Sequence, residues 1–107
     1  MSAYVSDATI SIEGGGASFV LRFAGAFDLG SAELIDGAAD TIDGAHAVVV
    51  DLTEVTVLDS AALEALMRLR DRLSNPVGLV LYGPSPRVRR VFEVAGLDRR
   101  LAIADAA

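Results

Sequence analysis

The sequence contains no cysteine, no lysine and only one histidine, His46. The absence of cysteine excludes disulfide bonds and thiolate metal sites, and one histidine cannot form the clusters that bind zinc. A serine nucleophile needs a base and a group that orients the base, and the single histidine lies just before a predicted central strand. We therefore expect no catalytic residue, no bound metal and no cofactor.

Basic residues and long apolar runs are also scarce. The 107 residues have a net charge of -6 and a pI near 4.5, which argues against a nucleic-acid partner and favours a protein partner. Hydrophobic residues make up 52%, yet no apolar run approaches the roughly 20 residues of a membrane span. The start, Met1-Ser2-Ala3-Tyr4, shows no secretory signal. We expect one cytoplasmic domain over residues 1–107, with no membrane association.

Strands are predicted where apolar residues alternate with polar ones or run without interruption between turn residues. The predicted strands are residues 8–12, 18–24, 45–51, 77–82 and 101–104. The first two are joined as a hairpin by the glycines that follow Glu13, and Gly25 marks the end of the second. The run Val48-Val49-Val50 predicts a central strand that is buried on both faces, and the last strand is a short edge strand.

Three amphipathic helices are predicted between these strands. The first follows Asp28-Leu29-Gly30-Ser31, the second starts at Ala61 and ends before Asn75-Pro76, and the third is capped by Ser85 and ends at Gly96. The inward stripe of the first helix is Leu34, Ile35, Ala38, Ala39 and Ile42; that of the third is Val88, Val91, Phe92 and Ala95. The core is expected to include Leu63, Leu66, Val49, Phe92 and Leu81. This order predicts an α/β fold with a four- to five-stranded mixed sheet and helices packed mainly on one face.

The stretch from Val55 to Leu66 holds the principal candidate site, because an apolar strand-like run stops at Asp59-Ser60 and restarts with helical spacing. Both residues are good N-caps, and one interpretation assigns them only that role. Asp28 and Asp59 could alternatively be paired ligands of a magnesium ion, but helix capping explains both residues more simply. Asp51 ends a predicted strand as a receiver-domain phosphoacceptor does, but receivers also have an early acidic pair and a lysine, and this chain has no lysine.

Three segments carry a resemblance to the STAS domain of the anti-sigma factor antagonist type, extending from about Ile10 to Ile103. Gly25-Ala26-Phe27-Asp28-Leu29-Gly30-Ser31 resembles the family's Gly-x-Leu-Asp-x-x-Thr/Ser motif after the second strand. The strand through Asp51-Leu52, the turn Asp59-Ser60 and the helix start Ala61-Ala62-Leu63 resemble the central part of the family. The segment from Ser85 to Leu97 matches the third helix of the family.

The resemblance implies a non-enzymatic switch protein. Its unphosphorylated form binds an anti-sigma factor and so releases a sigma factor, and the anti-sigma factor is often a serine kinase that phosphorylates the serine after the aspartate, here Ser60. A serine phosphatase resets such a switch. The residues expected to contact the partner are Asp28, Ser31, Asp59, Ser60, Ala61, Leu63 and Glu64.

Three positions depart from the family pattern. Ala61 replaces a common second serine or threonine, Ala62 stands where glycine is common, and Glu64 adds bulk and charge at a position that is often small. The alternative function is a STAS scaffold or interaction subunit of a larger sensory or transport assembly, in which Ser60 is only a helix cap. Phosphorylation of Ser60 by a bound kinase distinguishes the two.

Overall fold

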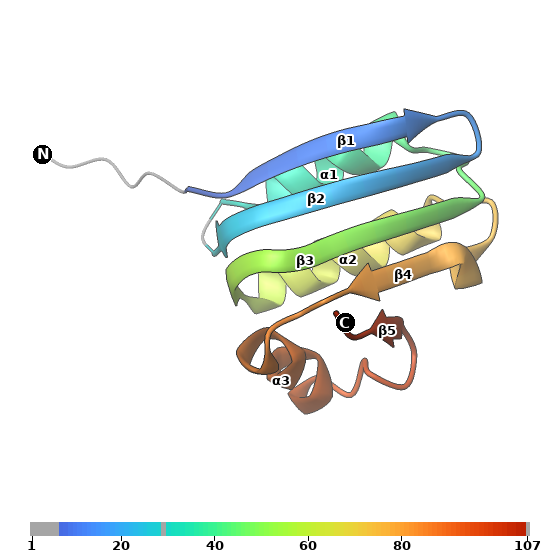
Figure 1. Cartoon of the computed structure of the whole chain (residues 1–107). Coiled ribbons are helices and arrows are strands. Elements are labelled where there is room, and N and C mark those ends of the chain that lie inside the picture. Colours follow the sequence, from blue (N-terminus) through green and yellow to red (C-terminus); the bar gives the residue numbers. More distant parts are fainter. Residues whose placement is uncertain (1–6, 29, 107) are drawn as a thin grey trace, which may run out of the picture.

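The computed structural model describes residues 7–28 and 30–106. The predictions made above for residues 1–4 and for Leu29 lie outside the described residues. Five strands form one sheet in the spatial order β1-β2-β3-β4-β5 (Figure 1). Their bounds are β1 Thr9–Gly15, β2 Ser18–Phe27, β3 Ala47–Leu58, β4 Leu79–Tyr82 and β5 Ala102–Ala104. Strand β1 is antiparallel to β2, and all other neighbours are parallel. The predicted mixed α/β sheet is confirmed.

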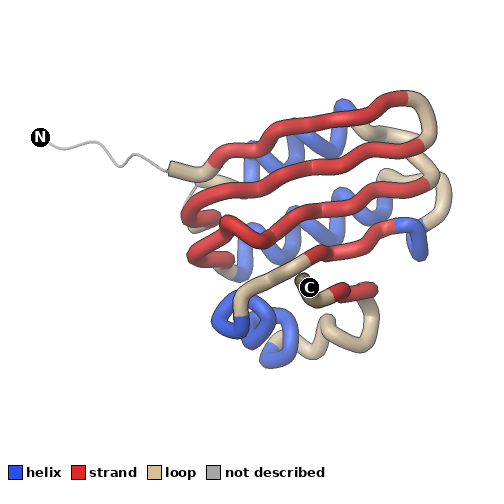
Figure 2. Tube along the Cα trace, in the orientation of Figure 1, coloured by secondary structure: helices blue, strands red, loops and turns tan. Residues whose placement is uncertain are grey.

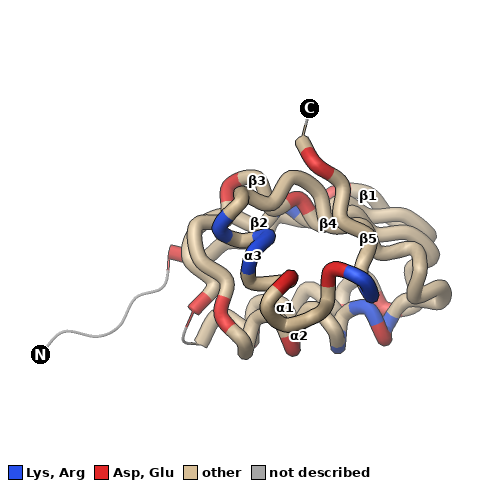
Figure 3. The backbone as a smooth tube through the Cα atoms, turned by 90° about the horizontal axis from the view of Figure 1, so that it is seen from below, with Lys and Arg blue, Asp and Glu red and all other residues tan. Residues whose placement is uncertain are grey.

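Three α-helices and one short 3-10 helix connect these strands. They are α1 Ala32–Thr41, α2 Ser60–Asp71, η1 Pro76–Gly78 and α3 Pro86–Val94. Figure 2 shows α1 and α2 side by side behind the sheet, and Figure 3, viewed from below, shows the sheet and these helices as two layers. No helix in the described part of the chain is long and apolar enough to cross a membrane.

The core lies between the sheet and the helices. Leu21, Val50 and Leu81 are paired in register on three neighbouring strands and are fully buried under the helix layer. Leu63, Leu66 and Phe92 approach them from the helices, as predicted. The core therefore forms where the apolar face of each strand meets the apolar stripe of a helix.

No helix of the described residues covers the opposite face of the sheet, so the prediction that the central strand is buried on both faces is wrong. Val20, Val49 and Val80 lie in register across this face and are only half-buried. A continuous β-branched run is compatible with one covered face, because alternate side chains point to opposite sides. Val49 is therefore not a core residue.

Two strands are longer than their local sequence suggests. Strand β2 continues past Gly25 to Phe27, and β3 continues past Asp51 to Leu58, because the two strands pair with each other almost to their ends. Register shifts between Arg22 and Ala24 and between Gly25 and Ala26 absorb the irregularity, and Gly25 has φ +91 there. Parallel pairing thus overrides local signals that indicate the end of a strand.

Other deviations lie at the surface. Leu34, predicted inward, is 44% exposed, and Ala95 is also exposed. Val77, predicted in a strand, lies in η1 and is 78% exposed. The predicted end of α3 is confirmed: Gly96 has φ 73, and the amide of Leu97 donates to the carbonyl of Phe92 at 2.9 Å.

The acidic face of α1 is occupied by arginines from α2. The guanidinium of Arg68 donates two hydrogen bonds of 3.1 Å to the carboxylate of Asp36, and Arg72 contacts both Asp40 and Asp43. Hydrogen bonds to these carboxylates raise the pKa of both arginines. Exposed pairs of this kind stabilise a protein by only about 0 to 1 kcal/mol each. They nevertheless connect this face of α1 to α2.

Candidate functional site at the start of α2

The site is built where β2 and β3 end. Phe27 is paired with Leu58 at the carboxyl ends of the two parallel strands, and the amide of Asp59 donates to the carbonyl of Phe27 at 3.0 Å. The turn that contains Asp28 and the turn that contains Ser60 therefore emerge at the same edge of the sheet, where α/β folds commonly place their sites.

Asp59 is the N-cap of α2. Its backbone is extended, with φ -93 and ψ 178, and its Oδ1 accepts a hydrogen bond of 2.9 Å from the amide of Ala62. The side chain is half-buried and directed at the helix end. Asp59 thus satisfies one of the free amides that every helix start presents. Of the two capping candidates in the sequence, Asp59 is the one that caps.

Ser60 is the first residue of α2, and its side chain is exposed. No hydrogen bond of its hydroxyl to another described residue is present, because Asp59 already provides the cap. The hydroxyl faces solvent beside the positive end of the helix dipole, where a negative group is favoured by about 0.3 to 1 kcal/mol. Ser60 is therefore accessible for modification without unfolding of the helix.

Two hollows between α2 and α3 meet at Ser60. One has a volume of about 330 Å³ and is lined by Ser60, Leu63, Arg90, Val91, Val94 and Ala95. The other has a volume of about 270 Å³ and is lined by Ser60, Leu63, Glu64, Met67, Ala95 and Leu97. We call the two together the α2–α3 groove. It offers an apolar surface next to an exposed hydroxyl.

The sequence did not identify the α3 wall of this groove. Val94 is 75% exposed, and it lies one turn after Arg90 on the same side of the helix. The sequence feature that could have indicated this wall is an apolar residue, Val94, in the last turn of α3 and outside the predicted inward stripe of that helix. That signal has meaning only when the fold brings the end of α3 beside the start of α2.

The expected contact residues are distributed unevenly around the groove. Ala61 and Glu64 are exposed and Asp28 is half-exposed, whereas Leu63 is only 6% exposed but lines both hollows. Ser31 is the exception and corrects an expectation. It is 1% exposed, and its Oγ donates to the carbonyl of Ala26 at 3.4 Å, so it is not part of the accessible surface.

Ser31 provides no side-chain cap for α1. The serine occupies the N-cap position with helical backbone angles, and its side chain makes no capping hydrogen bond. The amide of Ser31 instead donates to the carbonyl of Asp28 at 3.0 Å. This backbone hydrogen bond joins the start of α1 to Asp28.

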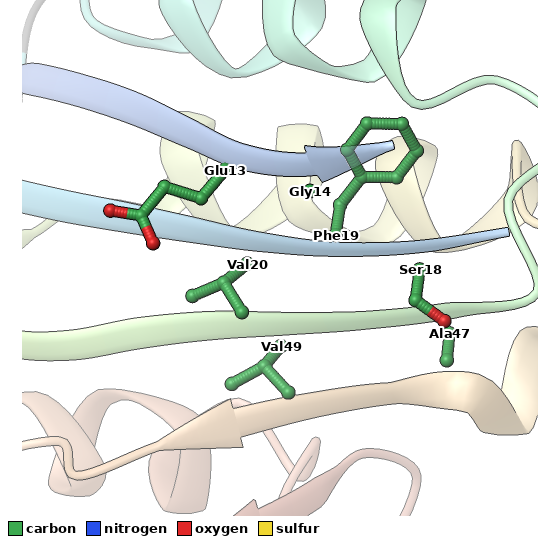
Figure 4. Close-up of a pocket in the computed structure, with 7 residues that line it drawn as sticks. All are labelled: Glu13, Gly14, Ser18, Phe19, Val20, Ala47 and Val49. Atoms are coloured by element: carbon green, nitrogen blue, oxygen red, sulfur yellow. The ribbon is translucent and has the colours of Figure 1, made fainter. Parts of the chain in front are cut away.

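A further hollow of about 360 Å³ lies on the uncovered face of the sheet and does not include Ser60. Figure 4 shows Val20 and Val49 side by side in it, with the carboxylate of Glu13 above them. Glu13 is held by Arg22, whose Nη1 lies 2.6 Å from its Oε1. Within the described residues, no group of three histidine, aspartate or glutamate side chains is arranged to bind a metal ion.

Comparison of the fold with solved structures finds similar chains. A crystal structure of an anti-sigma factor antagonist from Mycobacterium paratuberculosis has a TM-score of 0.82 and 24% identity, over 94% of this chain and 87% of that one. The anti-sigma factor antagonist SpoIIAA in its unphosphorylated form has a TM-score of 0.77 and 23% identity, over 92% and 89%. The Bacillus cell fate determinant SpoIIAA in the phosphorylated form has a TM-score of 0.70 and 22% identity, over 92% of each chain.

A comparison with curated protein sequences gives no match. The model of the STAS domain family, in contrast, matches residues 9–106, from the first residue of β1 to the end of the described chain. It therefore includes both turns at the sheet edge and both walls of the α2–α3 groove. Because this match covers nearly the whole chain, the chain belongs to the STAS domain family.

Proposed function

We propose that this protein is an anti-sigma factor antagonist that acts in the cytoplasm without a catalytic step of its own. The unphosphorylated protein binds an anti-sigma factor through the start of α2 and the α2–α3 groove, and thereby frees a sigma factor. The anti-sigma factor is a serine kinase that phosphorylates Ser60, and a serine phosphatase removes the phosphate.

The observation that carries this proposal is the position of Ser60. Its hydroxyl is exposed, takes no part in the cap of α2 and lies where two apolar hollows meet. A kinase needs such an accessible hydroxyl, and a partner protein needs apolar surface with polar groups at its rim. The solved relatives support the proposal, because SpoIIAA is known in both an unphosphorylated and a phosphorylated form.

Phosphorylation acts on the interface and leaves the fold intact in this mechanism. A phosphate adds roughly 1.5 to 2 negative charges. Repulsion from Asp59 is partly offset by the helix N-terminus, so α2 remains folded. A partner that packs against a bare hydroxyl must instead accommodate or desolvate a dianion, which lowers its affinity by orders of magnitude.

The test is to mix the protein with candidate kinase-type anti-sigma factors and ATP, and to locate the added phosphate by mass spectrometry. Ser60→Ala is expected to bind the same anti-sigma factor and to resist phosphorylation. Ser60→Asp is expected to fold normally and bind weakly. The matched control is Ser18→Asp, which adds the same charge at an exposed serine at the opposite end of β2. It is expected to bind like the parent protein.

Two results would contradict the proposal. Tight binding of the anti-sigma factor by Ser60→Asp would exclude a charge switch at this turn. Complete absence of binding and of phosphate at Ser60 with every kinase-type anti-sigma factor tested would favour a STAS scaffold within a larger assembly. In that case Ser60 is only the first residue of α2.

A further inference from the structure

Arg90 is the only basic residue that lines the α2–α3 groove. It lies on α3, is exposed, and lines the same hollow of about 330 Å³ as Ser60. Four of the nine arginines form ion pairs among the described residues, namely Arg22, Arg68, Arg72 and Arg89. Arg90 forms none within residues 7–28 and 30–106, so its guanidinium is available for a new anion.

The charged residues next to Ser60 in the chain, in the second hollow and on the neighbouring turn are acidic. Asp59 precedes it, Glu64 follows one turn later on α2 and lines the second hollow, and Asp28 lies on the neighbouring turn. On α3, Glu93 is exposed but lines neither hollow. A negative group on Ser60 is thus repelled from the Glu64 side of the groove and attracted toward the Arg90 side.

We propose that Arg90 pairs with the phosphate of phosphorylated Ser60 and draws it across the hollow between α2 and α3. This inference rests on the proposed phosphorylation of Ser60. A guanidinium is well suited to the role, because it donates two parallel hydrogen bonds to phosphate oxygens. Phosphate at the start of α2 and Arg90 on α3 then connect the two helices across the hollow that both of them line.

The pairing gives phosphorylation a second effect on the docking surface. The phosphate comes to lie over the apolar wall formed by Leu63 and Val94, of which Val94 is 75% exposed in the unmodified protein. The same contact removes the only basic side chain that the groove presents to a partner. Phosphorylation therefore closes the groove as well as adding charge to it.

The experiment measures the ionisation of the phosphate itself. Phosphoserine is incorporated at position 60 of the full chain during translation, and the second ionisation of its phosphate is followed by ³¹P NMR between about pH 4 and 8, around its usual pKa near 6. A nearby cation favours the dianion. Arg90→Ala should therefore raise the titration midpoint by roughly 0.2 to 0.7 pH unit, the size expected of an exposed ion pair.

Two further variants give the measurement its controls. Arg99→Ala removes an exposed arginine that also forms no ion pair among the described residues and that lines a different hollow, with Arg70 of the last turn of α2. It should leave the midpoint unchanged. Glu64→Gln removes the opposing charge and should lower the midpoint.

An identical midpoint in the parent and in Arg90→Ala would overturn the inference, as would an equal rise in Arg99→Ala. Because phosphoserine is incorporated without a kinase, this outcome leaves the antagonist function untouched. Conversely, a chain that no kinase modifies at Ser60 would reject the proposed switch, whatever the phosphate titration shows.

Discussion

The backbone amide of Asp59 donates a hydrogen bond of 3.0 Å to the carbonyl of Phe27. The two residues are 32 positions apart in the sequence; Phe27 is the last residue of β2, and Asp59 directly follows the last residue of β3. This bond continues the pairing of β2 and β3 by one residue. It thereby sets the position of the first residue of α2 relative to the end of β2. The position of Ser60, the next residue, therefore depends on β2 as well as on its own helix.

Asp59 and Ser60 should differ in their contributions to stability. Asp59→Ala removes the carboxylate that accepts from the amide of Ala62, and should lower the free energy of unfolding by about 1 kcal/mol. Ser60→Ala removes an exposed hydroxyl and should change it by less than about 0.5 kcal/mol. Urea unfolding followed by circular dichroism measures both. Equal losses in the two variants would mean that Ser60 also contributes to the cap.

Leu66→Ala should be strongly destabilising, because Leu66 is 0% exposed in the layer between α2 and the sheet. Removal of a fully buried leucine side chain costs on the order of 2 to 5 kcal/mol. Leu34→Ala is the matched control, since Leu34 is 44% exposed on α1, and should cost under about 1 kcal/mol. Thermal unfolding of the two variants tests the packing of the helices. Similar melting temperatures would contradict it.

Asp28→Ala should weaken binding of the anti-sigma factor without unfolding the protein. Asp28 lies in the turn after β2, next to the turn that carries Ser60, and its side chain is half-exposed. Asp71→Ala removes the same charge from the exposed last residue of α2, at the far end of that helix from Ser60. Isothermal titration calorimetry measures the affinity of each variant for the anti-sigma factor. Equal affinities in folded variants would exclude Asp28 from the interface.

The ion pair of Glu13 and Arg22 on the uncovered face should be visible in the pH dependence. A hydrogen bond from Arg22 and its positive charge hold the pKa of Glu13 below its ordinary 4.5. A depressed carboxylate pKa stabilises the folded state above about pH 4.5, and this contribution is lost as the pH falls through the folded-state pKa. Arg22→Gln should move the Glu13 midpoint up toward 4.5, measured by ¹³C NMR of the carboxyl carbon.

Arg99→Gln is the control for that titration. Arg99 lies on the segment before β5 and not beside β1, so the Glu13 midpoint should be that of the parent protein. A midpoint that does not respond to Arg22→Gln would show that the pair does not persist in solution. Glu13 is exposed, so the effect on melting temperature should be small and should decrease further at high salt.

Several features of this protein are determined by local sequence. The order of strands and helices, the caps at Asp59 and Ser85 and the helix end at Gly96 follow from residue types that act within one turn of the chain. Such signals depend on backbone groups only a few residues away, so the sequence contains all of their physical causes.

Other features depend on contacts between segments that are distant in sequence. Strand β3 runs through Asp51 because β2 pairs with it, and Val49 is half-buried because no helix within residues 7–28 and 30–106 covers that face of the sheet. Ser31, a polar residue expected at the surface, is buried against the carbonyl of Ala26.

Some features of the candidate site are likewise determined by local sequence, and others by contacts between distant segments. The Asp59-Ser60 turn follows from local sequence, because a strand, a cap and a helix start follow one another there. The placement of Arg90 and Val94 in one groove with Ser60 depends instead on packing between helices, since the end of α3 lies beside the start of α2 in the folded chain. Which side chains are buried, and which helices lie close together, is decided when the helices pack on the sheet. The sequence pattern of a single helix does not contain this information.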